Sequence, residues 1–358
     1  MGGNPTTCIW PEGPIRLRRI YRWWDNQKNT PHLLTWDASS PIRHKTRRDW
    51  STKRFGTDSA DPLWRTRGEE RPRNTYQGSR DRLKKWRTQV SDWIISVTIG
   101  IFILAYLVFA AVSFVAFASE RKVLFYLATA FGLIILAAHG AAIVMRGIEA
   151  RHLPWTNTYE TLILLGFLIV AIYFATYRRY RMIVVGGFAG LIVSAILALT
   201  SLLSPEIEPL IPSLKSNWLL FHVVSAFIGY SSFALAAASA GIHLGLKFFS
   251  RGGKAENRLE YLNWLTYRFI AFGFPFLTLG ISAGAVWANA SWGRYWNWDP
   301  KETWAFITWL IYGICLHMQC DKGCRGTWVP FVTLLGFATV MFTYFGVNFW
   351  LSSLHAYW

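Results

Sequence analysis

The part of this sequence with the clearest chemical potential is residues 287–304, where five tryptophans occur within eighteen residues. Two or three tryptophans are ordinary at a membrane interface, because the amphipathic indole ring suits the headgroup zone. Five offer a flat, apolar shelf for a large planar ligand, and Gly293 is expected to let the backbone approach it closely. The candidate ligand-contacting residues are Trp292, Gly293, Trp296, Trp298 and Asp299.

The same segment ends with a helix start signal. Asp299 suits the N-cap position, Pro300 the first helical position and Glu302 the first turn of a helix. We therefore expect the tryptophan shelf to stop at Asp299 and a helix to begin at Pro300.

Three histidines could bind iron. His222 lies near one end of an apolar run at 218–246, and His355 lies just beyond a run at 328–350. If the apolar runs alternate in direction, both emerge beside the tryptophan segment, and two facing imidazoles suit a six-coordinate heme iron. His317 sits within a third run, where a polar side chain is expensive and indicates a function. A single histidine at a helix end is more often an interfacial residue, but two beside one aromatic shelf favour ligation.

Apolar helices must position these residues. Of 358 residues, 53% are hydrophobic and 16% charged, which is more apolar side chain than one soluble core needs. Runs of roughly 17–25 apolar residues, long enough to cross about 30 Å of hydrocarbon, exclude barrel strands. The fold class is therefore all-α, a polytopic membrane helix bundle of about eight transmembrane helices with an extra basic amino-terminal segment. The runs are 93–117, 123–145, 161–177, 182–203, 218–246, 265–287, 304–317 with a short extension, and 328–350.

The distribution of Lys and Arg predicts the orientation. Basic clusters recur at alternate connections, for example at 178–181 and 322–325, and we place this side in the cytoplasm. The opposite, outer side then receives 149–158, the loop with Glu206 and Glu208, the tryptophan segment and the tail 351–358.

The amino-terminal segment runs against this orientation. Eight crossings place it outside, yet residues 1–92 contain 20 Lys and Arg against 10 Asp and Glu. It is a basic disordered tail, a segment that binds nucleic acid or anionic lipid, or the product of an upstream start codon with the true start near Val90. A nucleic-acid role is the least favoured. We divide the chain into this extension, 1–90, and a transmembrane domain, 91–358.

A family resemblance rests on residues 292–309, WGRYWNWDPKETWAFITW, and on the following His317. This run resembles the tryptophan-rich WWD signature of heme-handling membrane proteins, and it looks most like the CcsA (ResC) branch of system II cytochrome c biogenesis. The resemblance extends from about Val90 to the end of the chain. It includes RHLPWTNTYE at 151–160 and SNWLLFH at 216–222.

The resemblance implies a subunit of a cytochrome c synthase, which joins heme b to the CxxCH motif of apocytochrome c mainly by positioning it. His222 and His355 correspond to the external iron ligands, and His317 to an intramembrane ligand. A CcsB (ResB) subunit would supply the second intramembrane histidine, with membrane lipid and thiol reductants as further partners. The family implies the bacterial inner membrane, or the thylakoid in plastid relatives, with the WWD segment on the outer face.

Two other functions compete. A CcmC-type heme exporter would deliver heme to a chaperone without forming a thioether, but its signature departs from Lys-Glu-Thr-Trp and lacks a counterpart of His317. A heme-free membrane scaffold would use its tryptophans only as interface anchors. Trp155 departs from the family pattern, and His139 has no family role, so we interpret it as a packing residue. Cys320 and Cys324 are too few to predict a metal site.

Overall fold

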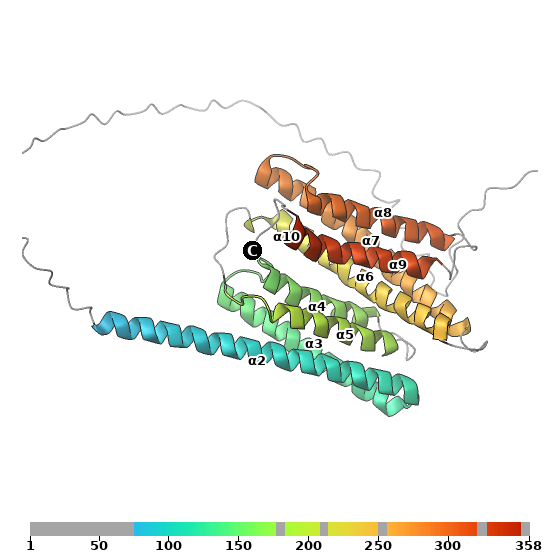
Figure 1. The fold of residues 1–358 in the computed structure, drawn as a ribbon, viewed down its shortest axis with the longest axis horizontal. Coiled ribbons are helices and arrows are strands. Elements are labelled where there is room, and N and C mark those ends of the chain that lie inside the picture. The colour runs from blue at the N-terminus through green and yellow to red at the C-terminus, as the bar shows by residue number, and fades with distance from the viewer. Residues whose placement is uncertain (1–74, 177–182, 208–213, 250–255, 321–327, 352–358) are drawn as a thin grey trace, which may run out of the picture. The chain divides into compact units, whose positions relative to one another are not determined.

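The computed structural model of this protein describes residues 75–176, 183–207, 214–249, 256–320 and 328–351. The chain divides into two compact units, Met1–Gly78 and Ser79–Trp358, and apart from the first residues of α2 the described helices lie in the second. Within the described residues the regular structure is helical, with no strand. The helices are α2 (Thr75–Ser119), α3 (Lys122–Ala150), α4 (Thr158–Thr176), α5 (Ile183–Thr200), α6 (Asn217–Phe249), α7 (Glu256–Trp292), α8 (Pro300–Cys320), α9 (Val329–Met341), the π-helical turn η5 (Phe342–Gly346) and α10 (Val347–Trp350) (Figure 1).

Each predicted apolar run coincides with a helix, and the last one with the succession α9, η5 and α10. Most boundaries differ by a few residues, and two helices differ most. Helix α7 extends beyond the predicted 265–287 at both ends, and α2 begins at Thr75 rather than near residue 93. Residues 75–90, which we assigned to the basic extension, are therefore helical. Residues 1–74 lie outside the described residues, so the domain division at residue 90 stays a prediction.

Seven candidate spans are long and apolar enough to cross a membrane: Ile95–Ser119, α3, α4, α5, α6, α7 and Val329–Gly346. The predicted run at 304–317 forms α8, which is not among them. Its first turn contains Lys301 and Glu302, and its last contains His317, which lowers the mean hydropathy. The all-α polytopic membrane bundle is confirmed, with seven candidate spans in the described part of the chain rather than eight.

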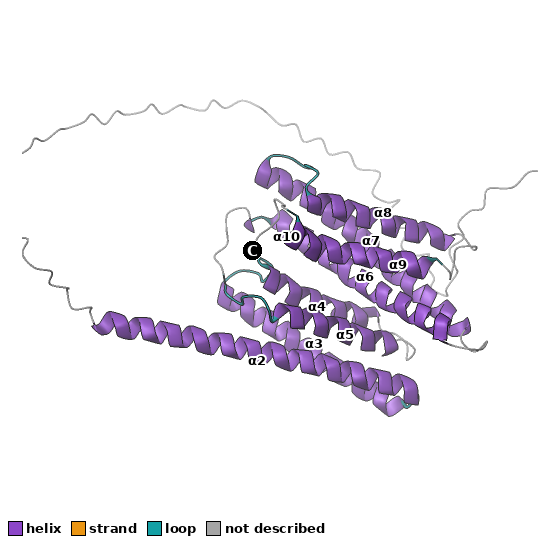
Figure 2. Ribbon diagram, viewed as in Figure 1, coloured by secondary structure: helices purple, strands orange, loops and turns teal. Residues whose placement is uncertain are grey.

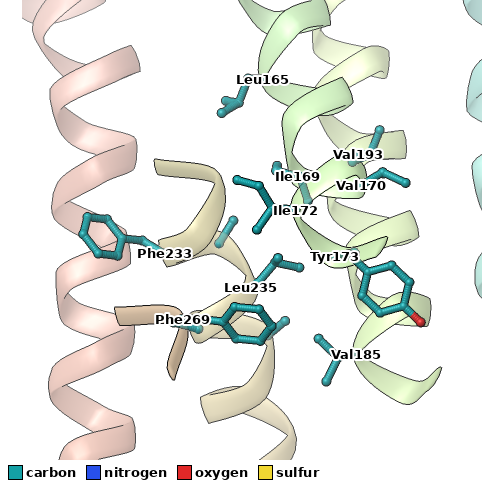
Figure 3. Close-up of a cluster of buried hydrophobic side chains, with 14 of the residues drawn as sticks. Leu165, Ile169, Val170, Ile172, Tyr173, Val185, Val193, Phe233, Leu235 and Phe269 are labelled. Atoms are coloured by element: carbon teal, nitrogen blue, oxygen red, sulfur yellow. The ribbon is translucent and has the colours of Figure 1, made fainter. Parts of the chain in front are cut away.

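The core lies where α4 and α5 meet α6 and α7. Figure 3 shows side chains of these helices directed toward one another, and they are almost fully buried because each lies on the shared face of its helix. This packing places the start of α4 beside α6, where the loops converge. The core residues drawn include Ile169, Ile172 and Tyr173 of α4, Val185 of α5, Leu235 of α6 and Phe269 of α7.

Helices α6 and α7 approach each other closely through small residues. A Cβ atom added at Gly280 would lie 3.0 Å from the backbone nitrogen of Ala226, and one at Gly229 would lie 3.2 Å from the carbonyl oxygen of Gly273. Small residues at such positions let two backbones approach within van der Waals distance in a membrane.

Three described connections gather at one end of the bundle, at the left in Figure 2: residues 151–157, 201–207 and 293–299. The Asn157 side chain donates a hydrogen bond of 3.4 Å to the Glu206 carbonyl, which joins the first two. This grouping is what alternating crossings predict. Its assignment to the outer face of a membrane stays a prediction, and the tail 352–358 lies outside the described residues.

Candidate functional site

A cavity of about 220 Å³ lies at this end of the bundle. Its walls come from the loop before α4, the first turns of α6, the end of α7, residues 295–296, the start of α8 and η5. Most of the lining is apolar or aromatic, with a few polar groups that converge from different helices, a combination typical of a small-molecule site. The polar groups among them that can be charged near neutral pH are His222, Lys301 and Glu302.

His222 is the predicted iron ligand that the structure places in this wall. Its Nδ1 lies 2.7 Å from the Gly280 carbonyl oxygen, and because a carbonyl only accepts, Nδ1–H is the donor. In the neutral ring Nε2 then carries the lone pair that a metal requires. The imidazole also stacks on Trp287, with ring centroids 6.4 Å apart and an interplanar angle of 11°. Helix α7 therefore fixes both the tautomer and the plane of this ring.

Of the other two predicted iron ligands, the structure describes His317 alone, and His317 is not among the residues that line the cavity. His355 lies outside the described residues. His317 is exposed in the last turn of α8, and from Trp304 to His317 the helix rises about 20 Å. No cluster of three or more His, Cys, Asp and Glu side chains that could hold a metal occurs within the described ranges. The roles of His317 and His355 stay predictions.

The tryptophan segment does not form one flat shelf. Trp296 lines the cavity, but Trp298 meets it edge-on at 5.7 Å with an interplanar angle of 89° and is 69% exposed. Trp292 packs edge-on against Trp287 at 4.9 Å. Two left-handed residues in this segment turn the chain: Gly293, with φ of 77°, and Trp298, with φ of 55°. Such turns rotate successive indole rings out of a common plane.

Gly293 has a conformational role in the chain itself. A Cβ atom there would meet no other heavy atom of the protein within 4 Å, so packing does not require a glycine, and the expected close approach to a ligand stays a prediction. Its positive φ accounts for the residue, because glycine adopts the left-handed region without steric cost. Gly293 therefore ends α7 and redirects the chain toward Trp296.

The predicted helix start is confirmed at Pro300. Asp299 is buried, and its Oδ1 accepts a 3.0 Å hydrogen bond from the Lys301 amide. Glu302 Oε2 accepts from the amides of Asn297 at 2.9 Å and Asp299 at 3.2 Å. This reciprocal arrangement is a capping box. Asp299 and Glu302 therefore hold the tryptophan segment against α8.

Lys301 is a functional candidate that sequence reasoning missed. It lines the cavity, and burial lowers its pKa to about 8, although nearby Asp299 acts in the opposite direction. A cation in the first turn of a helix runs against the helix dipole, and this mismatch was a signal that could have found it. Lys301 can pair with a carboxylate of a ligand in the cavity.

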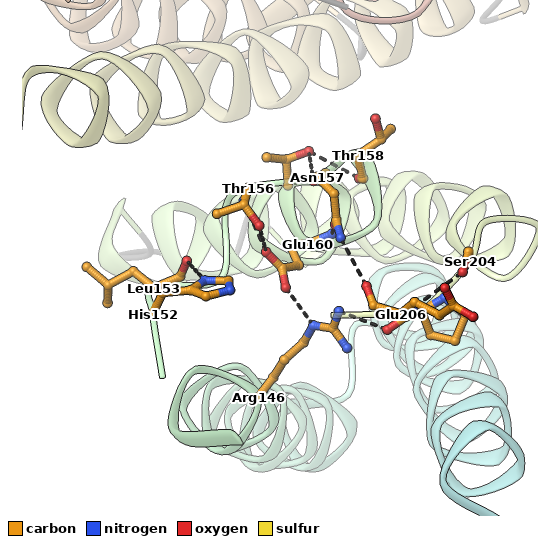
Figure 4. Close-up of polar contacts among 11 residues, drawn as sticks. Arg146, His152, Leu153, Thr156, Asn157, Thr158, Glu160, Ser204 and Glu206 are labelled. Atoms are coloured by element: carbon orange, nitrogen blue, oxygen red, sulfur yellow. Dashed lines mark hydrogen bonds and ion pairs between the residues drawn. The ribbon is translucent and has the colours of Figure 1, made fainter. Parts of the chain in front are cut away.

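A buried polar cluster supports the wall next to α4 (Figure 4). Arg146 Nε donates to Glu160 Oε1 at 3.0 Å, and the two side chains are 10% and 1% exposed. Glu160 Oε2 accepts from the Thr156 amide at 3.0 Å and hydroxyl at 2.8 Å. Arg146 Nη2 also donates to the Pro205 carbonyl at 3.0 Å. We call Arg146, Thr156, Glu160 and Pro205 the α4 clamp, because they join two loops to the start of α4.

The turn η5 completes the wall. Thr343 and Tyr344 line the cavity, and the Tyr344 hydroxyl lies 2.7 Å from Thr161 Oγ1. π-helical turns are rare and frequently occur at functional sites. Nothing in the continuous apolar run 328–350 marks this turn, so the sequence could not reveal it.

The fold and this cavity define a multi-pass helical membrane protein with an aromatic-lined cavity at one end of its bundle. The model of the family described as "Cytochrome C assembly protein" matches residues 155–355, which contain the whole cavity lining. The chain belongs to this family.

Curated relatives are CcsA-type proteins. The chain is 38% identical over 265 residues to "Cytochrome c biogenesis protein CcsA" of Guillardia theta, covering 66% of this chain and 87% of that protein. It is 32% identical over 313 residues to the protein of the same name in Gloeobacter violaceus, covering 71% and 93%. The predicted resemblance to the CcsA branch is confirmed.

The fold also occurs in a solved structure. "Cytochrome c Heme Lyase CcmF" superposes with a TM-score of 0.54 at 19% identity. The match covers 70% of this chain but 46% of that chain, so this protein spans less than half of its length. At this identity the likeness concerns the fold alone.

Proposed function

We propose that this protein binds heme b at the cavity and presents it for covalent attachment to the CxxCH motif of apocytochrome c. The observation that carries the proposal is His222, held by the Gly280 carbonyl in the wall of an aromatic cavity, in a member of the cytochrome c assembly family. In this proposal heme is a substrate that the protein passes on to the apocytochrome, and not a resident cofactor.

The residues present fit this substrate. Nε2 of His222 is the iron ligand, since Nδ1 carries the proton. Trp296 and Trp287 provide apolar ring surface for the macrocycle, and Lys301 provides a cation for a propionate carboxylate. His355 supplies the second axial ligand in this proposal.

The reaction is the addition of a cysteine thiol across a heme vinyl group. A bond forms between sulfur and one vinyl carbon, the thiol hydrogen passes to the other, and the step has no net oxidation or reduction. The nucleophile is the cysteine sulfur of the apocytochrome, so the protein contributes mainly by holding the vinyl edge toward the incoming thiols.

The wider assembly follows the family. A CcsB (ResB) subunit is the partner, apocytochrome c is the acceptor, and thiol reductants keep its cysteines reduced. The cavity faces the outer side of a bacterial inner membrane or the corresponding side of a thylakoid. His317, at the other end of α8, serves heme on its way into the cavity.

The first test replaces the iron ligands. His222→Ala and His355→Ala should each lower the heme that copurifies with the protein, measured by the reduced-minus-oxidised spectrum. Added imidazole should partly restore it by filling the vacant coordination position. Full heme content and full cytochrome maturation in the double variant would refute the proposal.

The second test concerns delivery. His317→Ala should leave the cavity intact and yet lower its heme content, and imidazole should restore it. Coexpression with the partner and an apocytochrome then separates the synthase from a CcmC-type exporter, because only the synthase yields heme covalently bound to CxxCH. Heme found instead on a chaperone would favour the exporter.

A further inference from the structure

We propose that Gly284 is a positioning residue for His222, and that α7 holds the imidazole in a three-sided cradle that sets the iron-ligating nitrogen. The cradle consists of the Gly280 carbonyl, Gly284 and Trp287. This inference rests on the proposed function in one respect, namely that His222 binds the heme iron.

The first observation is the space that Gly284 leaves. A Cβ atom built there would lie 2.6 Å from Nδ1, 2.8 Å from Cε1 and 3.3 Å from Cγ of His222. All three of its nearest heavy atoms belong to this one imidazole. Any side chain at position 284 must therefore displace the ring.

The second observation separates this glycine from its neighbours on the same face. At Gly280, an added Cβ would meet the backbone of Ala226, at 3.0 Å from its nitrogen and 3.1 Å from its Cα. Gly280 thus serves the close packing of two helices. One turn further along α7, the facing group on α6 is the side chain of His222, so Gly284 serves the ring and not the approach of two backbones.

The third observation is that the cradle acts on the ring from three directions. Positions 280, 284 and 287 lie on one face of a helix, because they are spaced by four and three residues. The Gly280 carbonyl holds the proton on Nδ1 at 2.7 Å, Trp287 stacks on the ring at an angle of 11°, and Gly284 leaves room for it. Metal-ligating histidines commonly donate their second N–H to a backbone carbonyl.

The consequence is specific. An alanine at position 284 displaces the ring, which breaks the hydrogen bond from Nδ1 to the Gly280 carbonyl and the stacking on Trp287. The proton is then no longer held on Nδ1, and Nε2 turns away from its position. Loss of such orienting contacts typically weakens metal binding about 10- to 100-fold. Gly284→Ala should therefore lower heme affinity by about that factor although position 284 contributes no ligand atom.

The test uses the full-length protein purified with its endogenous heme. Gly284→Ala should show a strongly reduced heme-to-protein ratio and a shifted reduced heme spectrum, and imidazole should partly restore both. The matched control is Gly241→Ala in α6, because a Cβ atom there meets no heavy atom within 4 Å. It should keep the heme content of the unmodified protein, and an equal loss in both variants would overturn the inference.

A double variant separates the ring from general packing. With His222→Ala already present, Gly284→Ala should cause no further loss of heme, since the ring it displaces is gone. If Gly284→Ala alone fails to accumulate, the double variant should accumulate again, and continued failure would show that the clash is not with His222.

The two proposals fail in different ways. If His222→Ala retains full heme, the proposed iron ligand is wrong. If His222→Ala loses heme while Gly284→Ala retains it with an unchanged spectrum, the ligand stands and the cradle is refuted.

Discussion

The two walls of the cavity are held by opposite means. The wall of α6 and α7 is held by close contacts at glycines of α7, with Gly280 against the backbone of Ala226 and Gly284 against the imidazole of His222. The α4 wall is held by the buried ion pair Arg146–Glu160 and the hydrogen bonds around it.

The difference lies in how the stabilisation is spread. Close packing distributes small contact energies over the whole helix pair. One added methyl group therefore disturbs only the contacts next to it. A buried ion pair concentrates a large electrostatic energy in two side chains. Removing one of them leaves the other as an unpaired buried charge, which costs much unfolding free energy. One substitution in the ion pair of the α4 wall should therefore lower the unfolding free energy more than one substitution in the packed α6–α7 wall.

The largest effect is expected from breaking the ion pair. Arg146→Met leaves the Glu160 carboxylate, which is 1% exposed, without its cation and should cost about 3–5 kcal/mol of unfolding free energy. Denaturant unfolding of the protein in detergent measures the loss. Replacing both residues, as Arg146→Met with Glu160→Leu, should recover much of it, because no charge is then buried alone.

The control for this prediction is the exposed pair of Arg258 and Glu120, 3.6 Å apart with side chains 56% and 74% exposed. Glu120→Gln should change stability by about 0–1 kcal/mol, since solvent screens exposed pairs. Similar losses for the two pairs would show that burial does not distinguish them.

A smaller effect is expected from the packed wall. Gly280→Ala places a Cβ atom 3.0 Å from the Ala226 backbone nitrogen and should cost about 1–3 kcal/mol as the helices separate. The same unfolding measurement applies. Gly245→Ala, whose Cβ meets no atom within 4 Å, should be neutral or slightly stabilising because alanine has the higher helix propensity. A loss larger than that of Arg146→Met would reverse the comparison.

The capping box should matter less than either wall. Glu302→Ala removes the acceptor for the amides of Asn297 and Asp299 and should cost about 0.5–2 kcal/mol. Hydrogen exchange at these two amides should accelerate, whereas Glu302→Gln keeps an acceptor oxygen and should retain most of the protection. Unchanged exchange in the alanine variant would mean that the cap does not hold the tryptophan segment.

The smallest effect concerns pH. With a pKa of about 8, Lys301 passes from mostly cationic at pH 7 to mostly neutral at pH 9, so attraction for a ligand carboxylate falls as pH rises. Heme retention should decrease about two- to fivefold over this interval, the size of one partly exposed ion pair. Lys301→Arg should flatten the profile, because arginine stays protonated. The same slope in Lys301→Met would exclude Lys301 as its source.

Local features of the fold were predictable from the sequence. Continuous apolar runs predict helices because a backbone in lipid must satisfy its own hydrogen bonds, and within the described residues each predicted run contains a helix. The helix start at Pro300 was predictable because Asp299, Pro300 and Glu302 act on their own backbone within one turn. The amino-terminal boundary of α2 was not predictable, since its first turns are polar and carry no apolar signal.

The site was only partly predictable. Its histidine and tryptophans were identified by residue type, but the flat shelf was wrong, because the left-handed turns at Gly293 and Trp298 are backbone conformations that composition does not reveal. The α4 clamp was missed because Arg146 and Glu160 are fourteen residues apart, and only the loop between α3 and α4 brings them together.

The sequence by itself determined the helical membrane architecture, the helix start after the tryptophan segment and the family to which the chain belongs, since all three depend on local composition and order. The tertiary structure decided which helix faces meet. Gly284 is one of many glycines until α7 packs against α6 and sets it beside His222. Side chains distant in sequence acquire a common function only when helix packing fixes their distance and direction, and no local pattern specifies either.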